Sequence, residues 1–492
     1  MHRALLLPEI VTAIVRAGKT EPGLLYSCLF VNKLFSHEAC RILWKGCYGI
    51  FGVSHVTPKI SDLGNMVLRA DIGLERAQVY ANFIRILVFQ EDEFTSEDDA
   101  QWHPQLCQLQ FPLLEDLNIW KTKSAEQMNT ERTILHYAHP GLRDLRVDAS
   151  GPLSDHFLDE LGRLSPRLQQ LDIDFKNVTI SKEGLARFLG RMPSLESIHV
   201  AALEKSWSTD AFVAVAKYER LKLLHIPAVP DSWFDDTRLS SVPDPFPVLK
   251  YLYCLGMTDK GLRYLHASCS GLEALHLYNS QMNVAELILP AAAQFSRLTK
   301  FRYLPGPLAC ITGQDLVGLA RGCTSLVSLS IGQDEMPYPT STGIDDSIWY
   351  SLAEALPSVE ELILYYKSTH YPNLASILLA LTQHCPLLHK LETCFGSDWT
   401  SLCPREQPYL LPNLWSMKLQ PQLNPEQVLT RDDHQALICD FETHAEQWFP
   451  RLEFLIIDEA IGIPGSNWEQ PFMDHISNLA YEREEAFNGY CA

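Results

Sequence analysis

Residue types that could perform catalysis or bind a metal are present, but their spacing suits neither task. His384 lies beside Cys385, yet adjacent residues point in different directions, so a paired nucleophile and base are not expected there. The thirteen cysteines are scattered without a C-x-x-C pair, and His434 and His444 have no cysteine at ligand spacing. No G-x-G-x-x-G, P-loop, H-E-x-x-H or G-x-S-x-G motif occurs in a fitting context. We therefore predict no catalytic residue, no metal site, no cofactor and no enzyme activity.

Tyrosine, histidine and basic side chains recur in the middle of the chain, at alternate positions of short apolar segments. Tyrosine buries a large area at low entropic cost and keeps a polar tip, which is typical of protein-binding hot spots. The residues predicted to bind a protein target are Tyr251, Tyr253, His276, Tyr278, His225, Lys300 and Arg302. The alternative, equally open from the sequence, is that tyrosine and histidine simply tolerate half-exposed sheet positions.

The elements that would position these side chains are short strands with a shared pattern. Segments such as FPLLEDLNIW, GLRDLRVDA and GLEALHLYN have one apolar residue, two variable residues, and then apolar residues with period two. This alternation predicts a strand with one buried face. The first apolar position of each unit falls at Ile84, Leu114, Leu142, Leu168, Leu195, Leu221, Leu249, Leu272, Leu298, Leu326, Val359, Leu388, Leu414 and Leu452. The mean step of about 28 residues is within the leucine-rich-repeat range and predicts about 13 to 14 strand–helix units.

Segments with helical spacing separate these strands. A unit of one strand and one helix cannot bury its own apolar side, so it must stack on its neighbours. MTDKGLRYLHASCSGLEALHL and ITGQDLVGLARGCTSLVSLSI resemble the cysteine-containing leucine-rich repeat, with Cys269 and Cys323 at its cysteine position. HCPLLHKLE places Cys385 at the same point, where a buried cysteine is expected. The predicted fold class is α/β, with a leucine-rich-repeat solenoid whose parallel sheet forms the concave face.

Three polar segments interrupt the repeat spacing. GQDEMPYPTSTG and QPQLNPEQVLTRDDHQ lengthen two of the steps, and VPDSWFDDTRLSSVPDPFP is a third segment rich in turn formers. We expect all three to project as loops from one rim of the solenoid. After the last strand, residues 470–487 have a helical pattern charged on one side, which suits a terminal cap.

Composition argues against several classes of partner. The chain has 492 residues and a net charge of -20 without a basic block, so neither nucleic acid nor a membrane is expected as a partner. No apolar run approaches the roughly 18 residues of a membrane span. Pro8 and Glu9 cut the first apolar run too short for a signal peptide. Cysteines without a disulfide pattern suit a reducing compartment, so we expect a cytoplasmic or nuclear location, or both.

The first fifty residues lack the strand pattern and predict three short amphipathic helices instead. Pro8 suits a first helical turn, and Glu9 would lie beside the positive end of the helix dipole. Apolar stripes follow at 10–15, 24–31 and 35–44. Three helices of this length make a very small core, so part of their apolar surface is expected to need an outside partner.

These three segments, LLPEIVTAIV, LLYSCLFVNKLF and ACRILWK, resemble an F-box. The proline is displaced from the family pattern, with Leu7 in its usual place and Pro8 one position later. The resemblance implies that the module docks a Skp-type adaptor and, through it, a cullin. The adaptor contacts that it implies are Leu6, Leu7, Pro8, Ile10, Ile14, Leu24, Leu25, Leu29, Val31 and Phe35. The alternative that stays open for Ile10, Ile14, Leu25 and Trp44 is a place in the internal core.

An F-box followed by leucine-rich repeats resembles the substrate receptor of an SCF-type ubiquitin ligase, in which the repeats hold a protein for ubiquitination. The predicted domains are the F-box at 1–48, a helical connection at 49–80, the solenoid at 81–469 and a C-terminal cap and tail at 470–492. Two alternatives stay open. One is an F-box scaffold that binds a partner without promoting its degradation, and the other is a repeat protein that regulates an enzyme directly. The pattern does not identify the target.

Overall fold

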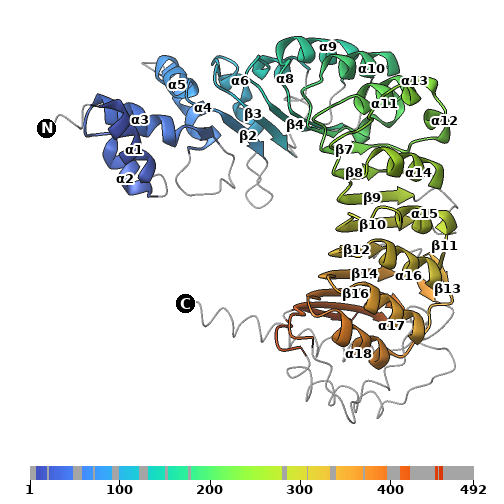
Figure 1. Ribbon diagram of the computed structural model, residues 1–492. Helices are drawn as coiled ribbons and strands as arrows, with labels where there is room; N and C mark the ends of the chain where they lie inside the picture. The colour runs from blue at the N-terminus through green and yellow to red at the C-terminus, as the bar shows by residue number, and fades with distance from the viewer. Residues whose placement is uncertain are drawn as a thin grey trace, which may run out of the picture. The chain divides into compact units, whose positions relative to one another are not determined.

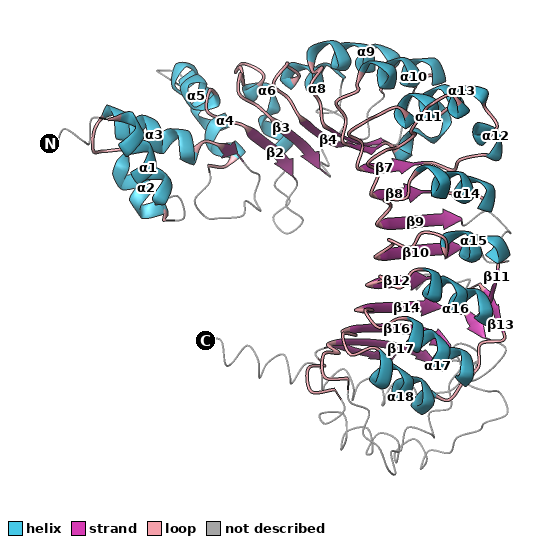
Figure 2. Cartoon of the chain, in the orientation of Figure 1, coloured by secondary structure: helices cyan, strands magenta, loops and turns pink. Residues whose placement is uncertain are grey.

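The structure, a computed structural model, divides into two compact units. The first contains residues 1–227 and 236–248, and the second contains residues 228–235 and 249–492. The described residues are 7–18, 21–47, 58–69, 73–90, 99–120, 131–149, 153–175, 179–279, 285–306, 309–332, 339–368, 372–395, 411–421, 449–452 and 454–457. Within each unit, parallel strands lie side by side and helices cover one face of the sheet (Figure 1, Figure 2).

The first unit begins with three short helices, which we call the helical module. They are α1 (Pro8–Ala17), α2 (Pro22–Cys28) and α3 (Lys33–Leu43). Proline stands in the first turn of α1 and α2, where its missing N–H has no helical partner to lose. Asn32 begins α3, because its side-chain oxygen accepts hydrogen bonds from the N–H groups of Leu34 and Phe35 at 2.9 and 3.0 Å. The three predicted helices are confirmed, and the first starts at Pro8.

The core of the helical module is small. Its buried side chains are Val11, Val15, Leu25, Cys28, Phe35, Ala39 and Leu43. Two further helices, α4 (Ile60–Leu68) and α5 (Gly73–Ala81), lie between this module and the repeats. Trp44, directly after α3, stacks on Tyr80 of α5 with 4.6 Å between ring centroids and 9° between planes. This stack attaches α5 to the end of the helical module.

Seven parallel strands form the sheet of the first unit. They are β1 (Gly46–Cys47), β2 (Ile86–Gln90), β3 (Asp116–Trp120), β4 (Asp144–Ala149), β5 (Gln170–Phe175), β6 (Ser197–His199) and β7 (Leu223–Ile226). The helical segments between or after them are η2 (Asp99–Trp102), α6 (His103–Leu106), α8 (Glu131–Tyr137), α9 (Asp155–Leu164), α10 (Lys182–Arg191), η3 (Ala201–Ser206), α11 (Thr209–Ala216) and α13 (Thr237–Ser240). The pattern predicted no strand before residue 50, and β1 has only two residues, which is too short for an alternation to be read.

Eight parallel strands form the main sheet of the second unit. They are β8 (Tyr251–Cys254), β9 (Ala274–Asn279), β10 (Lys300–Pro305), β12 (Ser328–Ile331), β14 (Glu361–Tyr365), β16 (Lys390–Phe395), β17 (Ser416–Pro421) and β18 (Phe454–Ile457). The helices of this unit are α12 (Asp231–Phe234), α14 (Asp259–Ser268), α15 (Ala285–Ala292), α16 (Gly313–Gly322), α17 (Asp346–Ala355) and α18 (Leu374–His384).

The strand pattern read from the sequence is confirmed throughout the described residues. Each of the fourteen first apolar positions, from Ile84 to Leu452, precedes one of the strands from β2 to β18 and is at most 6% exposed. The pattern works because successive side chains of a strand point to opposite faces, so one apolar set always meets the helices. The predicted α/β fold with a parallel sheet of stacked strand–helix units is therefore confirmed, and it fits a leucine-rich-repeat solenoid.

A second, three-stranded parallel sheet lies beside helices α15 and α16 and was not predicted. Its strands are β11 (Cys310–Thr312), β13 (Thr340–Thr342) and β15 (Lys367–Ser368). The strand β13 falls at the end of GQDEMPYPTSTG, which was expected to project as a loop. That prediction is wrong for residues 339–342, because Thr340 N–H donates to Ala309 O at 3.0 Å and Lys367 N–H donates to Pro339 O at 2.7 Å. Residues 333–338 lie outside the described part.

The segment VPDSWFDDTRLSSVPDPFP does not project either. It contains the short helices α12 in the second unit and α13 in the first. Its aromatic side chains are the reason: Phe234 is 7% exposed, and Phe246 is 1% exposed and packs against Phe212, with 5.5 Å between centroids. The predicted projecting loop is corrected to a packed segment.

Several predictions fall wholly or partly on undescribed residues. Residues 422–435 of the second expected loop and the expected cap at 470–487 lie outside the described residues. The domain boundaries at 48, 80 and 469 stay predictions.

Candidate functional site

The sheet face opposite the helices, which we call the open face, carries side chains at alternate strand positions. In the second unit, Tyr253 of β8, His276 of β9 and Arg302 of β10 lie side by side in register. The residues before them in β9 and β10, Leu275 and Phe301, point to the helices and are at most 1% exposed. The period-two alternation therefore places the predicted target-binding residues of these strands on the open face.

Four of these residues contact one another in pairs. The ring centroids of Tyr253 and His276 are 4.3 Å apart. The guanidinium carbon of Arg302 lies 5.9 Å from the ring centroid of Tyr278, which is within cation–π range. Tyr251, which is 37% exposed, and Lys300 lie on the same strands, with Ala274 between them in register. We use the name β8–β10 face for the set Tyr251, Tyr253, His276, Tyr278, Lys300 and Arg302.

The electrostatics of the β8–β10 face suit binding more than proton transfer. Burial, together with the positive charges of Arg302 and Lys300, lowers the pKa of His276 to about 4. Burial also raises the pKa of Tyr253 above its ordinary value. At neutral pH the imidazole and the phenol are therefore uncharged. A base with so low a pKa is poorly matched to proton abstraction at neutral pH.

His225, the remaining predicted target-binding residue, belongs to the first unit and to a different cluster. Its ring stacks on His199 with 4.1 Å between centroids and 17° between planes. His199 Nδ1 in turn lies 2.8 Å from the Asp172 carboxylate. The pairing follows from the register, because His199 of β6 faces His225 of β7. A role for any of these residues in target binding stays a prediction.

The helical module exposes a second group of large side chains. Of the residues predicted to contact an adaptor, Leu7, Ile14, Leu24 and Val31 are 50, 38, 40 and 46% exposed. Pro8 is exposed, and Ile10 and Leu29 are half-buried. Leu6 lies outside the described residues.

Two of the predicted adaptor contacts lie in the core of the helical module. Leu25 and Phe35 are 1% and 6% exposed and belong to the core of the helical module, so their side chains offer almost no surface to a partner. Two exposed aromatic residues were not predicted: Tyr26 is 51% exposed and Phe30 is 88% exposed. The apolar run LLYSCLFV contained the signal, but spacing alone could not separate its buried members from its exposed ones. We call Leu7, Ile14, Leu24, Tyr26, Phe30 and Val31 the module apolar surface.

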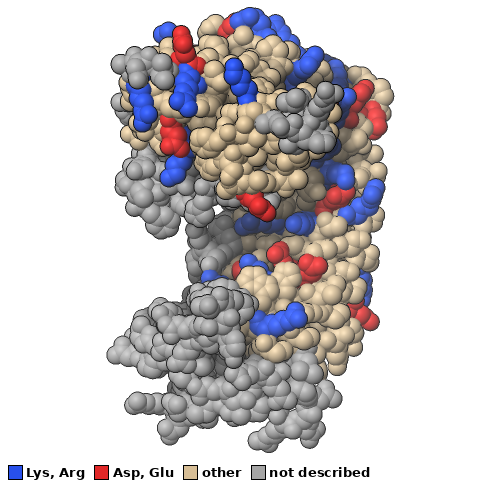
Figure 3. Space-filling model, turned by 90° about the vertical axis from the view of Figure 1, so that its left-hand side faces the viewer, with Lys and Arg blue, Asp and Glu red and all other residues tan. Residues whose placement is uncertain are grey.

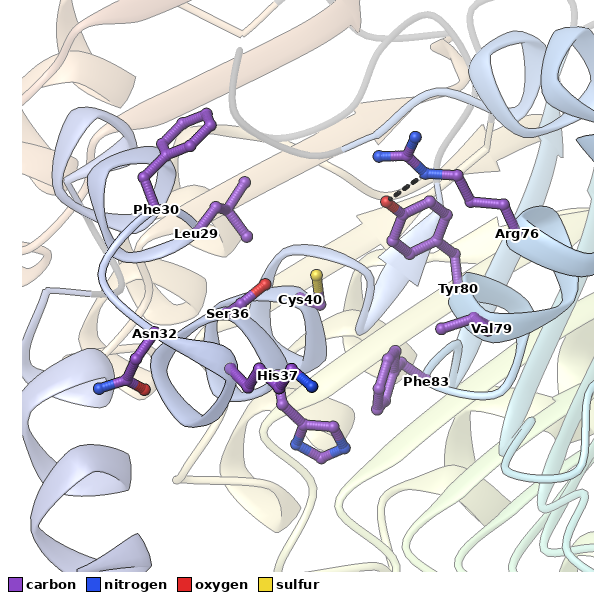
Figure 4. A pocket seen from close by; sticks show the side chains of 11 residues that line it. Leu29, Phe30, Asn32, Ser36, His37, Cys40, Arg76, Val79, Tyr80 and Phe83 are labelled. Atoms are coloured by element: carbon purple, nitrogen blue, oxygen red, sulfur yellow. Dashed lines mark hydrogen bonds between the residues drawn. The ribbon is translucent and has the colours of Figure 1, made fainter. Parts of the chain in front are cut away.

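A cavity of about 470 Å³ adjoins this surface, between the turn after α2, helix α3 and helix α5 (Figure 4). Leu29 and Phe30 lie on one side of it, and Val79, Tyr80 and Phe83 lie on the other. Its charged or titratable lining residues are Lys33, His37, Cys40, Tyr80 and Arg76, the last of which donates from Nε to Tyr80 Oη at 3.1 Å. Sequence reasoning missed the cavity because α5 was expected only as part of a connection.

The His384–Cys385 pair is structural as expected. Cys385 is fully buried, its thiol donates to Ala353 O at 3.5 Å, and burial raises its pKa to about 12. His384 instead packs edge-on against Tyr350, with 4.8 Å between centroids. The repeat cysteines Cys269 and Cys323 are also buried, at 3% and 0% exposure, in agreement with the resemblance.

One cysteine–histidine contact was not predicted. Cys107 Sγ lies 2.8 Å from His103 Nε2, and His103 Nδ1 lies 2.9 Å from Tyr137 Oη. Burial raises the pKa of the Cys107 thiol and lowers the pKa of His103 to about 4. Both partners are therefore neutral at pH 7, unlike the thiolate and imidazolium of an activated nucleophile. The cluster joins α6 to α8 and is a packing feature.

The buried His103 predicts a loss of stability in mild acid. Its folded pKa of about 4 is below the ordinary 6.5, so the unfolded chain takes up the proton first as the pH falls. The contribution of His103 to the free energy of unfolding is therefore fully present above pH 6.5, and it is lost as the pH falls from 6.5 to 4. For this one group we expect a loss of about 2 kcal/mol between pH 7.5 and pH 5. Urea unfolding of the wild type and of His103→Gln at both pH values would measure it, and parallel changes in the two proteins would contradict it.

Metal-binding and membrane-spanning features are absent from the described part of the chain. Among the residues described, no group of three or more His, Cys, Asp and Glu side chains is placed to hold a metal ion. No helix in the same ranges is long and apolar enough to cross a bilayer. His434 and His444 lie outside these ranges.

Comparisons with known proteins found only distant similarities to solved structures. No protein-family profile and no curated protein matches the chain. The leucine-rich repeat-containing protein LegL7 from Legionella pneumophila is 12% identical over 55% of this chain and 87% of its own, with a TM-score of 0.32. A chain of the yeast Rad7–Elc1 complex is 16% identical over 70% of this chain and 85% of its own, with a TM-score of 0.26. A chain of the Drosophila Toll–Spätzle complex is 14% identical over 69% of this chain and 54% of its own, with a TM-score of 0.30. Similarities this low carry no conclusion about function.

Proposed function

We propose that the protein is a non-catalytic substrate receptor of an SCF-type ubiquitin ligase. In this role the helical module is an F-box that docks a Skp-type adaptor, and the adaptor joins it to a cullin. The open face of the repeats holds the protein target. The proposal includes neither nucleic acid nor a membrane as a partner, and it places the protein in the cytoplasm, the nucleus or both.

The module apolar surface is the observation that carries this proposal. Six large apolar side chains, from Leu7 to Val31, are at least 38% exposed on a module whose core, among its described residues, contains seven side chains. Soluble proteins rarely leave so much apolar area uncovered unless a partner covers it. The position of this surface on the three helices that resemble an F-box favours an adaptor protein as that partner.

The open face supports the second half of the proposal. The β8–β10 face combines two exposed cations with three tyrosines, and aromatic and arginine side chains dominate binding hot spots. The protonated thiols of Cys107 and Cys385 favour a binding role over nucleophilic catalysis. We therefore assign target capture to the repeats and leave ubiquitin transfer to the other subunits of the ligase.

Reconstitution of the complex tests the proposal. The full chain, a Skp-type adaptor and a cullin would be purified separately, mixed and separated by size-exclusion chromatography. We expect all three to elute together. Once ubiquitin, ATP and the ubiquitin-activating and ubiquitin-conjugating enzymes are added, we expect ubiquitin transfer to proteins captured by the chain. Failure of a correctly folded chain to bind the adaptor would overturn the F-box assignment. Adaptor binding without ubiquitination of any captured protein would favour the scaffold alternative.

A further inference from the structure

Two basic side chains on the open face of the second unit differ from the cations around them. Lys300 and Arg302 of β10 are exposed, and no carboxylate among the described residues lies within ion-pair distance of either. Several other cations on or next to the strands are paired with carboxylates. The pairs are Arg85–Glu115, Lys222–Glu196 at 2.7 Å, Lys250–Glu273 at 2.7 Å and Lys390–Glu392 at 2.8 Å. The positive charge of β10 is thus left available on an otherwise acidic chain.

The residues beside Lys300 and Arg302 do not neutralise them. On one side, His276 is uncharged at neutral pH, because burial and, to a smaller extent, the positive charges of Arg302 and Lys300 lower its pKa to about 4. On the other side, Ser328 and Ser330 of β12 stand in register with Lys300 and Arg302. The next carboxylate in this row, Glu361, accepts a hydrogen bond from Ser328 Oγ at 2.8 Å. A serine therefore stands between Lys300 and the first acidic side chain.

An aromatic area lies next to these cations. Tyr251 and Leu255 are 37% and 36% exposed, and Tyr253 is half-buried against His276. Phenol rings of this kind bury apolar area with few rotatable bonds. The β8–β10 face consequently presents an apolar area on β8 and two positive charges on β10, two strands away, or about 10 Å. Figure 3 shows that charges of both signs are interspersed elsewhere on the visible surface.

We propose that the β8–β10 face binds an acidic segment of the protein target. Aspartate or glutamate side chains of the segment pair with Lys300 and Arg302, and a neighbouring apolar side chain packs on Tyr251 and Tyr253. This inference rests on the proposed function, in which the repeats hold the target, and it specifies the chemistry of that target.

Carboxylates suit this arrangement better than a single phosphate group. Lys300 and Arg302 are two residues apart on one strand, so their Cα atoms are separated by about 7 Å. A phosphate is best held by several donors that converge on one point. Two separated cations match two acidic side chains. The net charge of -20 adds selectivity, because an acidic segment is repelled by most of the remaining surface.

The test uses the full chain and synthetic peptides of matched length. Fluorescein-labelled peptides rich in glutamate, glutamine, lysine or phosphoserine, each with one leucine, would be titrated and followed by fluorescence anisotropy. We expect the glutamate peptide to bind at least about tenfold more tightly than the glutamine peptide. Its affinity should decrease as salt is added, since both cations are exposed. The lysine peptide should not bind.

Charge reversal provides the matched comparison. Lys300→Glu combined with Arg302→Glu should lower the affinity for the glutamate peptide about tenfold or more. Arg321→Glu combined with Lys367→Glu changes the net charge equally at two exposed residues away from this face, and it should change affinity less than about twofold. Equal effects of the two double variants would overturn the proposal. So would a glutamine peptide that binds as well as the glutamate peptide, or a phosphoserine peptide that binds more than tenfold better.

A separate measurement tests the proposed contact between the apolar side chain of the peptide and the two tyrosines. Removing the leucine from the glutamate peptide should weaken binding to the wild type but not to Tyr251→Ala combined with Tyr253→Ala, because the two changes remove one contact. Additive losses would overturn the assignment of the apolar residue to these tyrosines. Adaptor binding, measured in parallel, separates this inference from the proposed function: a chain that binds adaptor but not acidic peptides refutes only the inference.

Discussion

Replacing Leu24 and Phe30 together by aspartate is expected to abolish co-elution of the chain with its Skp-type adaptor. Both side chains belong to the module apolar surface, at 40% and 88% exposure. If an adaptor covers them, each aspartate would place a charge in an apolar interface, which is strongly unfavourable. Truncation of a central interface residue alone costs about 2 kcal/mol or more, so we expect the double variant to lose at least about 100-fold in affinity. Isothermal titration with the purified adaptor would measure the loss.

The control is a pair of exposed leucines outside the helical module. Leu113 and Leu387 precede β3 and β16 and are 43% and 49% exposed. Leu113→Asp combined with Leu387→Asp should bind the adaptor like the wild type. Both double variants should keep the wild-type unfolding midpoint within experimental error, because exposed substitutions rarely change stability by more than about 0.5 kcal/mol. Equal adaptor affinity for both double variants would show that the module apolar surface is not the docking site.

Gly332→Ala is expected to destabilise the second unit by about 3 kcal/mol. Gly332 follows β12 with φ of +85°, and its N–H donates to Tyr303 O at 2.8 Å. A Cβ at this position would lie 2.2 Å from Tyr365 O and 2.8 Å from Tyr365 Cβ. The substitution therefore combines backbone strain with a clash against the next repeat. Urea unfolding followed by circular dichroism would measure it.

Gly343 separates the two contributions. Its φ is +65°, yet a Cβ there would meet nothing within 4 Å. Gly343→Ala should consequently cost only the left-handed strain, about 1 kcal/mol. If both alanine variants lost the same stability, the contact with Tyr365 would not matter, and Tyr365 would have to move without cost.

The repeats could be predicted from the sequence because their structure is local and periodic. The alternation in SLVSLSI requires Leu329 and Ile331 to face the same way, and both are fully buried. The same rule places Tyr253, His276 and Arg302 in one row on the open face. The period-two alternation does not predict which side chains form ion pairs between different repeats. Lys250 and Glu273 form an ion pair 23 positions apart, and nothing in either segment distinguishes Lys250 from the unpaired Lys300.

The helical module illustrates a second limit. Leu24 and Leu25 are adjacent and equally apolar, but one is 40% exposed and the other 1%. Which of them faces inward depends on how α2 packs against α1 and α3, and this is tertiary information. The cavity beside Phe30 and the cluster of His103 with Tyr137 were missed for the same reason, because each joins segments more than thirty residues apart.

The two-residue strand β1 affects how the helical module should be studied. Its pairing with β2 places Gly46 opposite Ile86 and Cys47 opposite Leu87, so it shields the backbone hydrogen-bonding groups on that side of β2. A truncation that removes residues 1–48 would leave β2 as an unprotected edge strand, and such edges promote aggregation. Loss of adaptor binding in a truncated protein would then be confounded with loss of solubility. Point substitutions that leave β1 in place avoid this artefact.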